Sequence, residues 1–146
     1  MIVNADGHVL GRLASFVAKQ ALLGRDVIVV NAEKALISGK RESVLRENME
    51  KLRIRNLGNP RKGPFHQKRP DRFVRRAIRG MLPMRSRRGR EAFKRINVYI
   101  GVPKGEIKRR HDIDIDREKI ENLDELKKNL RSYVTVEEIC RHIGWN

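Results

Sequence analysis

The first 32 residues constrain the fold most, because two kinds of apolar pattern alternate along them. Residues 2–5 predict a short strand, and Asp6 and Gly7 predict a turn. The next apolar residues recur at the spacing of one helical face: Leu10, Leu13, Ala14, Val17, Ala18, Ala21 and Leu22. Residues 27–30 form a continuous β-branched run, as in strands that are covered on both faces. A strand–helix–strand unit implies parallel pairing through a right-handed crossover, which predicts an α/β fold.

The same patterns predict further elements up to residue 103. We expect a third strand within 35–38, and a second helix over 41–54. A long loop rich in Gly and Pro follows over 56–70. Next comes a helix over 71–82 whose apolar stripe consists of Phe73, Val74, Ala77, Ile78, Met81 and Leu82. This part ends with three shorter elements. We expect a loop over 84–90, then a short helix with Ala92, Phe93 and Ile96 turned inward, and then a strand over 98–100.

The last third of the chain carries weaker signals. Ile113 and Ile115 alternate with aspartates, which fits either an edge strand or a solvated arm. Residues 123–130 are predicted to be helical. Thr135 and Glu138 match the capping box T-x-x-E, which predicts a final helix over 136–143.

The length of 146 residues fits one domain. Within it we expect an α/β core in residues 1–55 and 96–103. Residues 56–95 form the basic segment, and residues 104–146 form a C-terminal arm with helices.

Positive charge is concentrated in the basic segment. The net charge of the chain is +16, and residues 61–95 alone hold 14 basic and 2 acidic side chains. A solvated helix face would normally interleave acids with bases, and only Asp71 and Glu91 are available here. Of the 14 basic residues 11 are Arg, whose planar fork suits bidentate contact with phosphate and stacking on bases. The segment is therefore predicted to bind nucleic acid through its phosphates.

Other features favour structured RNA as the partner. A single Cys excludes zinc-finger spacing, and no heptad run follows the basic segment as in a basic-region zipper. Seven aromatic residues are too few for the stacking platform of single-strand binders. An architectural DNA-binding protein stays open as an alternative. A membrane-surface protein is disfavoured, because the basic helix lacks the exposed Trp and Phe that insertion requires.

Signals for catalysis or metal binding are weak. The turn between the first strand and helix lies where a doubly wound fold binds nucleotide phosphate, but its glycine spacing is G-x-x-x-G. That spacing favours a tight turn with close strand–helix packing. The four histidines, His8, His66, His111 and His142, have no ligand spacing, and only His66 lies in the basic segment. Asp112, Asp114 and Asp116 lack the Gly and Glu of a calcium loop, so a solvated or Lys-paired arm is expected.

These weak signals lead us to expect no cofactor, no metal, no small-molecule substrate and no enzymatic activity. Cys140 is expected to be a buried, inert thiol on the last helix. One Cys, no signal peptide and only short apolar runs predict a cytoplasmic protein without a membrane partner.

Five separated blocks of the sequence resemble one known family. They are DGHVLGRLAS at 6–15, VNAEK and ISG at 30–39, GPFH at 63–66, RAIRGMLP at 76–83, and a pattern of Arg88-Gly89, Ala92, Val98-Tyr99 and Gly101. In this order they resemble the large-subunit ribosomal protein thirteen family over about residues 1–103. The chain resembles the archaeal members, because it begins directly at the first strand and lacks a long C-terminal helical tail. The last 40 residues match the family pattern least.

This resemblance implies a three-layer α/β/α domain around a four-stranded, mostly parallel sheet. It implies a structural role in the large ribosomal subunit, in single copy, with large-subunit ribosomal RNA and neighbouring ribosomal proteins as partners. It also implies an early role in subunit assembly.

We expect the α/β core to hold the helix over 71–82 by its apolar stripe. Its Arg face and the two flanking loops then lie along RNA phosphates, and affinity falls steeply with salt. The predicted RNA-binding residues are Arg61, Lys62, His66, Lys68, Arg69, Arg72, Arg75, Arg76, Arg79, Arg85, Arg87, Arg88, Arg90, Lys94 and Arg95.

Overall fold

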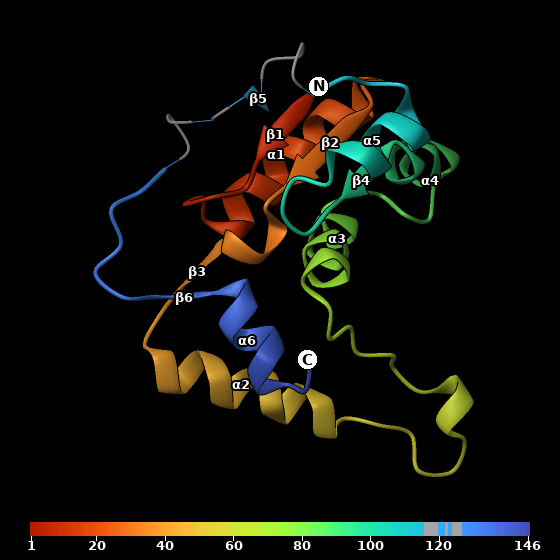
Figure 1. Ribbon diagram of the computed structural model, residues 1–146. Helices are drawn as coiled ribbons and strands as arrows, with labels where there is room; N and C mark the ends of the chain where they lie inside the picture. Colours follow the sequence, from red (N-terminus) through yellow and green to blue (C-terminus); the bar gives the residue numbers. More distant parts are fainter. Residues whose placement is uncertain (116–119, 122, 124–126) are drawn as a thin grey trace.

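A four-stranded parallel sheet forms the centre of the computed structural model, which describes residues 1–115, 120–121, 123 and 127–146 (Figure 1). The elements along the chain are β1 (Ile2–Asn4), α1 (Leu10–Leu22), β2 (Val27–Val30), η1 (Ala32–Lys34), β3 (Leu36–Ser38), α2 (Arg41–Arg53), η2 (Pro60–Lys62), α3 (Pro70–Gly80), α4 (Arg87–Lys94), β4 (Ile96–Val98), α5 (Lys104–His111), β5 (Ile120–Glu121), β6 (Tyr133–Thr135) and α6 (Val136–His142). The strand order is β4–β2–β1–β5, and each of these pairings is parallel. The predicted α/β class and the four-stranded parallel sheet are confirmed.

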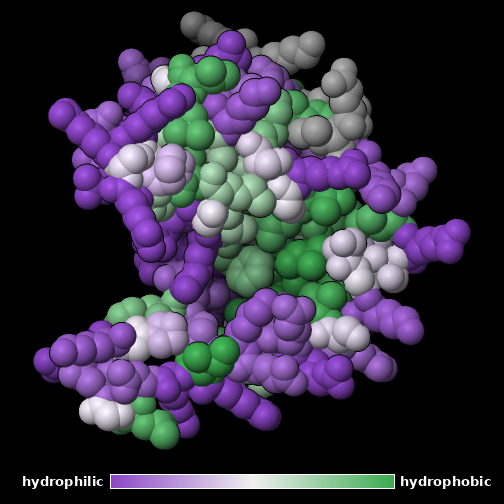
Figure 2. Space-filling view, turned by 180° about the vertical axis from the view of Figure 1, so that it is seen from behind, coloured by the Kyte–Doolittle hydropathy of each residue, from purple (hydrophilic) through white to green (hydrophobic). Residues whose placement is uncertain are grey.

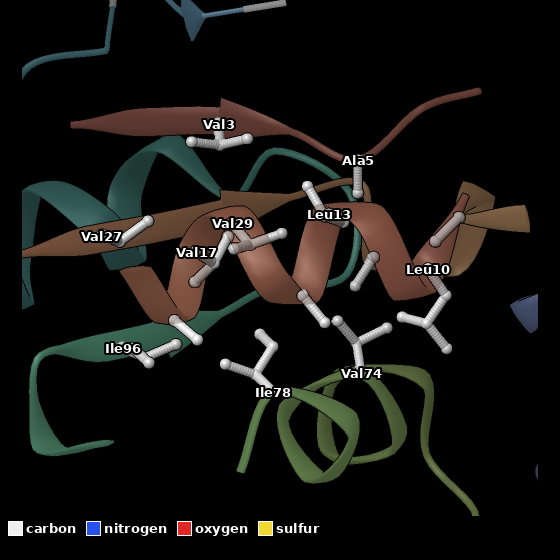
Figure 3. Close-up of a cluster of buried hydrophobic side chains, with 14 of the residues drawn as sticks. Val3, Ala5, Leu10, Leu13, Val17, Val27, Val29, Val74, Ile78 and Ile96 are labelled. Atoms are coloured by element: carbon white, nitrogen blue, oxygen red, sulfur yellow. The ribbon is translucent and has the colours of Figure 1, made fainter. Parts of the chain in front are cut away.

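The strand β2 is apolar throughout because both faces of the sheet are covered. Val27 and Val29 join a buried cluster that includes residues of α1, α3 and α4. Ile28 and Val30 join a second cluster on the other face, which includes Ile107 of α5. Figure 3 shows the first cluster, in which side chains of α3 point toward α1. Helices on both faces of the sheet give the three layers that the family resemblance implies.

A separate antiparallel pair, β3 and β6, carries the helices α2 and α6. Ile37 pairs with Val134, and a third buried cluster forms where Val44 and Leu45 of α2 meet Ile139 of α6. In Figure 1 the helices α2 and α6 lie at the bottom, below the parallel sheet. The strand predicted within 35–38 therefore forms, but outside the central sheet.

The last helix begins as the capping box predicts. The Thr135 hydroxyl oxygen accepts a hydrogen bond from the backbone N–H of Glu138 at 3.2 Å. This bond satisfies one of the amide groups that the first turn of a helix leaves free. Cys140 is fully buried on the inner side of this helix, as predicted.

Three predicted details between residues 81 and 100 are wrong. Met81 does not belong to the buried stripe, because α3 ends at Gly80 and the Met81 side chain is 43% exposed. Residues 87–90 belong to α4 and not to a loop, because Ser86 caps the helix by accepting from the N–H of Gly89 at 3.1 Å. The strand β4 begins at Ile96, which was predicted to end the preceding helix.

The helix α5, which follows Pro103 and covers the second face of the sheet, was not predicted from the apolar patterns. Residues 112–115 form no strand, and they are not a solvated arm either, because Ile115 is buried in the cluster on the second face of the sheet and Ile113 packs against it. Residues 123 and 127–130 are not helical, contrary to the prediction, and residues 124–126 lie outside the described part of the chain.

Candidate nucleic-acid interface

The helix α3 divides into an apolar and a basic face. Val74 and Ile78 are fully buried against the core, while Arg72, Arg76 and Arg79 are exposed. Residues three or four positions apart share one side of a helix, so the three Arg side chains form a single stripe. Burial of the apolar face holds this stripe outward, as the sequence predicts.

Arg75 lies at the edge of the basic face and is half-buried. Its guanidinium carbon lies 4.6 Å from the centre of the Phe93 ring, in a cation–π arrangement with α4. Its Nε is buried and has no hydrogen-bond partner among the described residues. The contact with Phe93 thus orients this cation without neutralising it.

The loop between α2 and α3 is held by its own polar groups. Asn56 accepts hydrogen bonds through Oδ1 from the backbone N–H groups of Gly58 and Asn59, both at 3.1 Å. The carbonyl oxygen of Phe65 accepts from the guanidinium of Arg76. His66 Nε2 lies 3.0 Å from the carbonyl oxygen of Ile54, so this ring contacts the loop itself. The predicted residues Arg61 and Lys62 are exposed in η2, within the same loop.

The turn before α4 and its first residues expose four more predicted cations: Arg85, Arg87, Arg88 and Arg90. Arg88 Nη2 donates to the carbonyl oxygen of Leu22 at 3.4 Å, which directs it toward α1. At the end of α4, Lys94 is exposed and Arg95 is half-buried. The basic surface therefore continues from α3 over α4.

Carboxylates neutralise little of this charge. In the described part of the chain, two of the predicted cations form ion pairs: Arg69 with Asp71 at 3.1 Å, and Arg87 with Glu91 at 2.8 Å. Exposed pairs of this kind contribute roughly 0–1 kcal/mol. The remaining cations repel one another, and an anionic partner would relieve that repulsion.

The structure brings some of the predicted residues together in two hollows. One combines four Arg residues of α3 with two aromatic rings: Arg72, Arg75, Arg76, Arg79, Phe65 and Phe93. The other combines Arg69 and Arg72 with Arg110 of α5. Arg110, Phe65 and Phe93 were not among the predicted site residues. Arg110 could have been predicted from the sequence, because residues 108–110 are three consecutive basic side chains.

A third hollow, of about 590 Å³, has a different character. It lies between α2 and α3, and apolar side chains such as Val44, Leu52 and Phe73 dominate its lining. Seen from behind, apolar side chains gather in the middle of the molecule, with hydrophilic ones above and below (Figure 2). Arg76 and His66, two of the predicted RNA-binding residues, also line this hollow, so it adjoins the phosphate-binding surface that we predict.

The turn after β1 is the tight turn that the sequence predicts. Gly7 has a φ of +72°, a conformation that favours glycine. His8 is fully buried, with Nδ1 2.9 Å from the carbonyl oxygen of Asp6 and Nε2 3.0 Å from that of Leu123. A β-carbon on Gly11 would have no neighbour within 4 Å, so close packing is not the reason for this second glycine.

Cys140 and the aspartates behave as structural groups. Burial and the nearby charge of Asp71 raise the pKa of the Cys140 thiol to about 12. Asp114 pairs with Lys108 at 3.2 Å, as predicted for a Lys-paired arm, and Asp112 ends α5 with a φ of +55°. Asp116 lies outside the described residues.

Neither a metal site nor a membrane span is found in the described residues. None of their His, Cys, Asp and Glu side chains form a group of three or more that could hold a metal ion. Their helices all fall short of the length and hydropathy that crossing a membrane requires.

Comparison with known proteins identifies the family. Residues 1–105 match the family described as ribosomal protein L13. The large ribosomal subunit protein uL13 of Methanopyrus kandleri is 41% identical over 99% of this chain and 86% of its own length. Its counterpart in Methanocaldococcus jannaschii is 41% identical over 98% of this chain and 96% of its own length. The similarity to these archaeal proteins includes the C-terminal third, where the sequence blocks typical of the family are weakest, and the chain belongs to the ribosomal protein L13 family.

Proposed function

We propose that this chain is a structural component of the large ribosomal subunit in the cytoplasm that binds large-subunit ribosomal RNA. As a member of a family of ribosomal proteins, it is not an enzyme. The observation that carries the proposal is the exposed stripe of Arg72, Arg76 and Arg79, opposite a fully buried apolar face. Among the described residues no carboxylate pairs with these three guanidinium groups, and such a stripe suits contact with successive phosphates.

The proposed contact surface consists of α3, α4 and the loop between α2 and α3. The predicted residues on it bind phosphates, and the parallel sheet with its helices serves as the rigid support. The chain takes part in early subunit assembly, because a folded, strongly cationic protein can hold RNA segments together by displacing their counterions. Neighbouring ribosomal proteins are the other proposed partners, with one copy of the chain in each subunit.

Sedimentation of a cell extract tests this function. The extract is separated on sucrose gradients at low and at high salt, and the chain is located by mass spectrometry. We expect it to travel with the large subunit and to leave it only at high salt. A chain that stays at the top of both gradients would contradict the ribosomal role. Competition between ribosomal RNA and duplex DNA then separates RNA binding from an architectural role on DNA.

A further inference from the structure

A hollow of about 560 Å³ lies on the basic face of α3, between the preceding loop and α4. Its lining includes two aromatic rings, Phe65 and Phe93. Four cations from α3 complete it: Arg72, Arg75, Arg76 and Arg79. Ring faces beside several guanidinium groups fit a ligand that is both flat and anionic. A nucleotide has both properties, because its base stacks on rings and its phosphate pairs with Arg.

The Phe65 ring is held at the surface. It is 67% exposed, although the loop that carries it is anchored. The guanidinium of Arg76 binds the carbonyl oxygen of Phe65, and the next residue, His66, contacts the carbonyl oxygen of Ile54 at 3.0 Å. The backbone that carries the ring is therefore anchored beside α3, the ring itself is not packed into the core, and a stacked base would remove its face from water.

The opposite side of the hollow presents a flat cation. The guanidinium carbon of Arg75 lies over the Phe93 ring, 4.6 Å from its centre, which holds the cation beside that ring. It forms no ion pair among the described residues, and its buried Nε has no hydrogen-bond partner there. A guanidinium held in this way offers a second stacking surface and an unneutralised charge. Gln67, also in the lining, adds an amide donor and acceptor for the edge of a base.

We infer that this hollow holds one unpaired nucleotide of the ribosomal RNA, with its base stacked on Phe65 and its phosphate between Arg72 and Arg79. This inference rests on the proposed function. A base inside a duplex offers its edges but not its face, so the nucleotide must be turned out of its helix. An acidic peptide fits less well, because its carboxylates would meet the cations but would leave the Phe65 ring uncovered.

The test uses the full chain and deproteinised archaeal large-subunit ribosomal RNA as the probe. Phe65→Leu removes the ring but keeps an apolar side chain, whereas Phe65→Tyr keeps the ring. Dimethyl sulfate and a 2′-hydroxyl acylating reagent report which nucleotides each protein protects. We expect the wild-type protein and Phe65→Tyr to protect a nucleotide that Phe65→Leu leaves reactive. The affinity of Phe65→Leu should fall about 10-fold, with unchanged salt dependence because the phosphate contacts remain.

Leu57→Ala is the matched control on the same loop, because Leu57 is 81% exposed and lies outside the lining of the hollow. Its protection pattern should equal that of the wild-type protein. Equal affinity and equal protection for Phe65→Leu and wild type would overturn the nucleotide site and leave the proposed function standing. A wild-type protein that binds this RNA no better than duplex DNA of equal length would overturn both.

Discussion

The backbone of Gly89 passes so close to Pro83 that a β-carbon on Gly89 would lie 2.1 Å from the Pro83 carbonyl oxygen. The carbonyl carbon of Pro83 would be only 2.5 Å away. These neighbours are backbone atoms, which cannot turn aside as a flexible side chain would. The close approach is what allows the turn after α3 to pass under the first turn of α4, and so places the two basic helices together.

Gly89→Ala should therefore destabilise the protein, although alanine is the better helix former. We expect the free energy of unfolding to fall by about 1–3 kcal/mol, the usual effect of overpacking. Gly80→Ala is the control, because a β-carbon on Gly80 would meet nothing within 4 Å. That change should be neutral or stabilising by up to about 1 kcal/mol. Urea denaturation measures both, and equal midpoints for the two variants would disprove the close contact.

Neighbouring substitutions in α3 should separate binding from stability. Arg79 is exposed and Ile78 is fully buried. Arg79→Glu should weaken RNA binding and lower the salt dependence of the affinity by about one phosphate contact, while the fold stays intact. Ile78→Asp should unfold the protein, because a carboxylate would enter the core without a partner. Thermal melting distinguishes them, and equal melting temperatures would contradict the two faces of α3.

The Cys140 thiol should lower the stability of the protein at high pH. Its pKa is raised from 9.0 to about 12 in the folded state, so between these values the unfolded chain loses the proton first. The unfolded state then binds fewer protons than the folded one, and the free energy of unfolding falls as pH rises through this window. Below about pH 9 the contribution is constant.

The comparison with Cys140→Ala isolates this effect from the titration of other groups. The variant should lose less stability than the wild-type protein between pH 9 and 12, the window of the raised pKa. Iodoacetamide at pH 8 should label the wild-type thiol only in denaturant, because a buried, protonated thiol is a poor nucleophile. Rapid labelling of the native protein would argue against the raised pKa.

The cap of α6 should contribute measurably to stability. Thr135→Ala removes the hydroxyl that accepts from the N–H of Glu138, and we expect a loss of about 1 kcal/mol. Thr135→Ser keeps the hydroxyl and serves as the control, with a much smaller loss. Denaturation by urea gives both values. If the alanine variant were as stable as the serine variant, the prediction would be wrong, because water would then replace the capping hydroxyl without lowering the free energy of unfolding.

Elements with local determinants could be predicted from the sequence. The strands and helix of the first 30 residues, the two faces of α3 and the cap at Thr135 depend on the spacing of nearby residues. The pairing of β3 with β6 could not be predicted, because alternation shows which face a side chain takes but not which strand lies beside it. Ile37 meets Val134, a partner from near the other end of the chain.

The candidate site likewise has one part that could be predicted from the sequence and one part that could not. Charge and helical spacing identified the Arg residues of α3, because both are properties of a short segment. The hollow around Phe65 could not be predicted, since its lining comes from a loop, α3 and α4, and depends on how they fold together. The prediction for residues 84–90 failed for a local reason. The many basic side chains of this segment favoured a loop, although Ser86 is a residue type that often caps a helix, as it does here.

The position of β1 has a consequence for the order of synthesis. β1 lies between β2 and β5, and β3 pairs with β6, so both early strands have partners that are translated near the end. A nascent chain stopped after α5 has open strand edges at β1 and β3, and such edges favour aggregation. The buried ring of His8 likewise contacts the carbonyl group of Leu123, which is translated late. The N-terminal half therefore completes its native pairing only when almost the whole chain has left the ribosome that makes it.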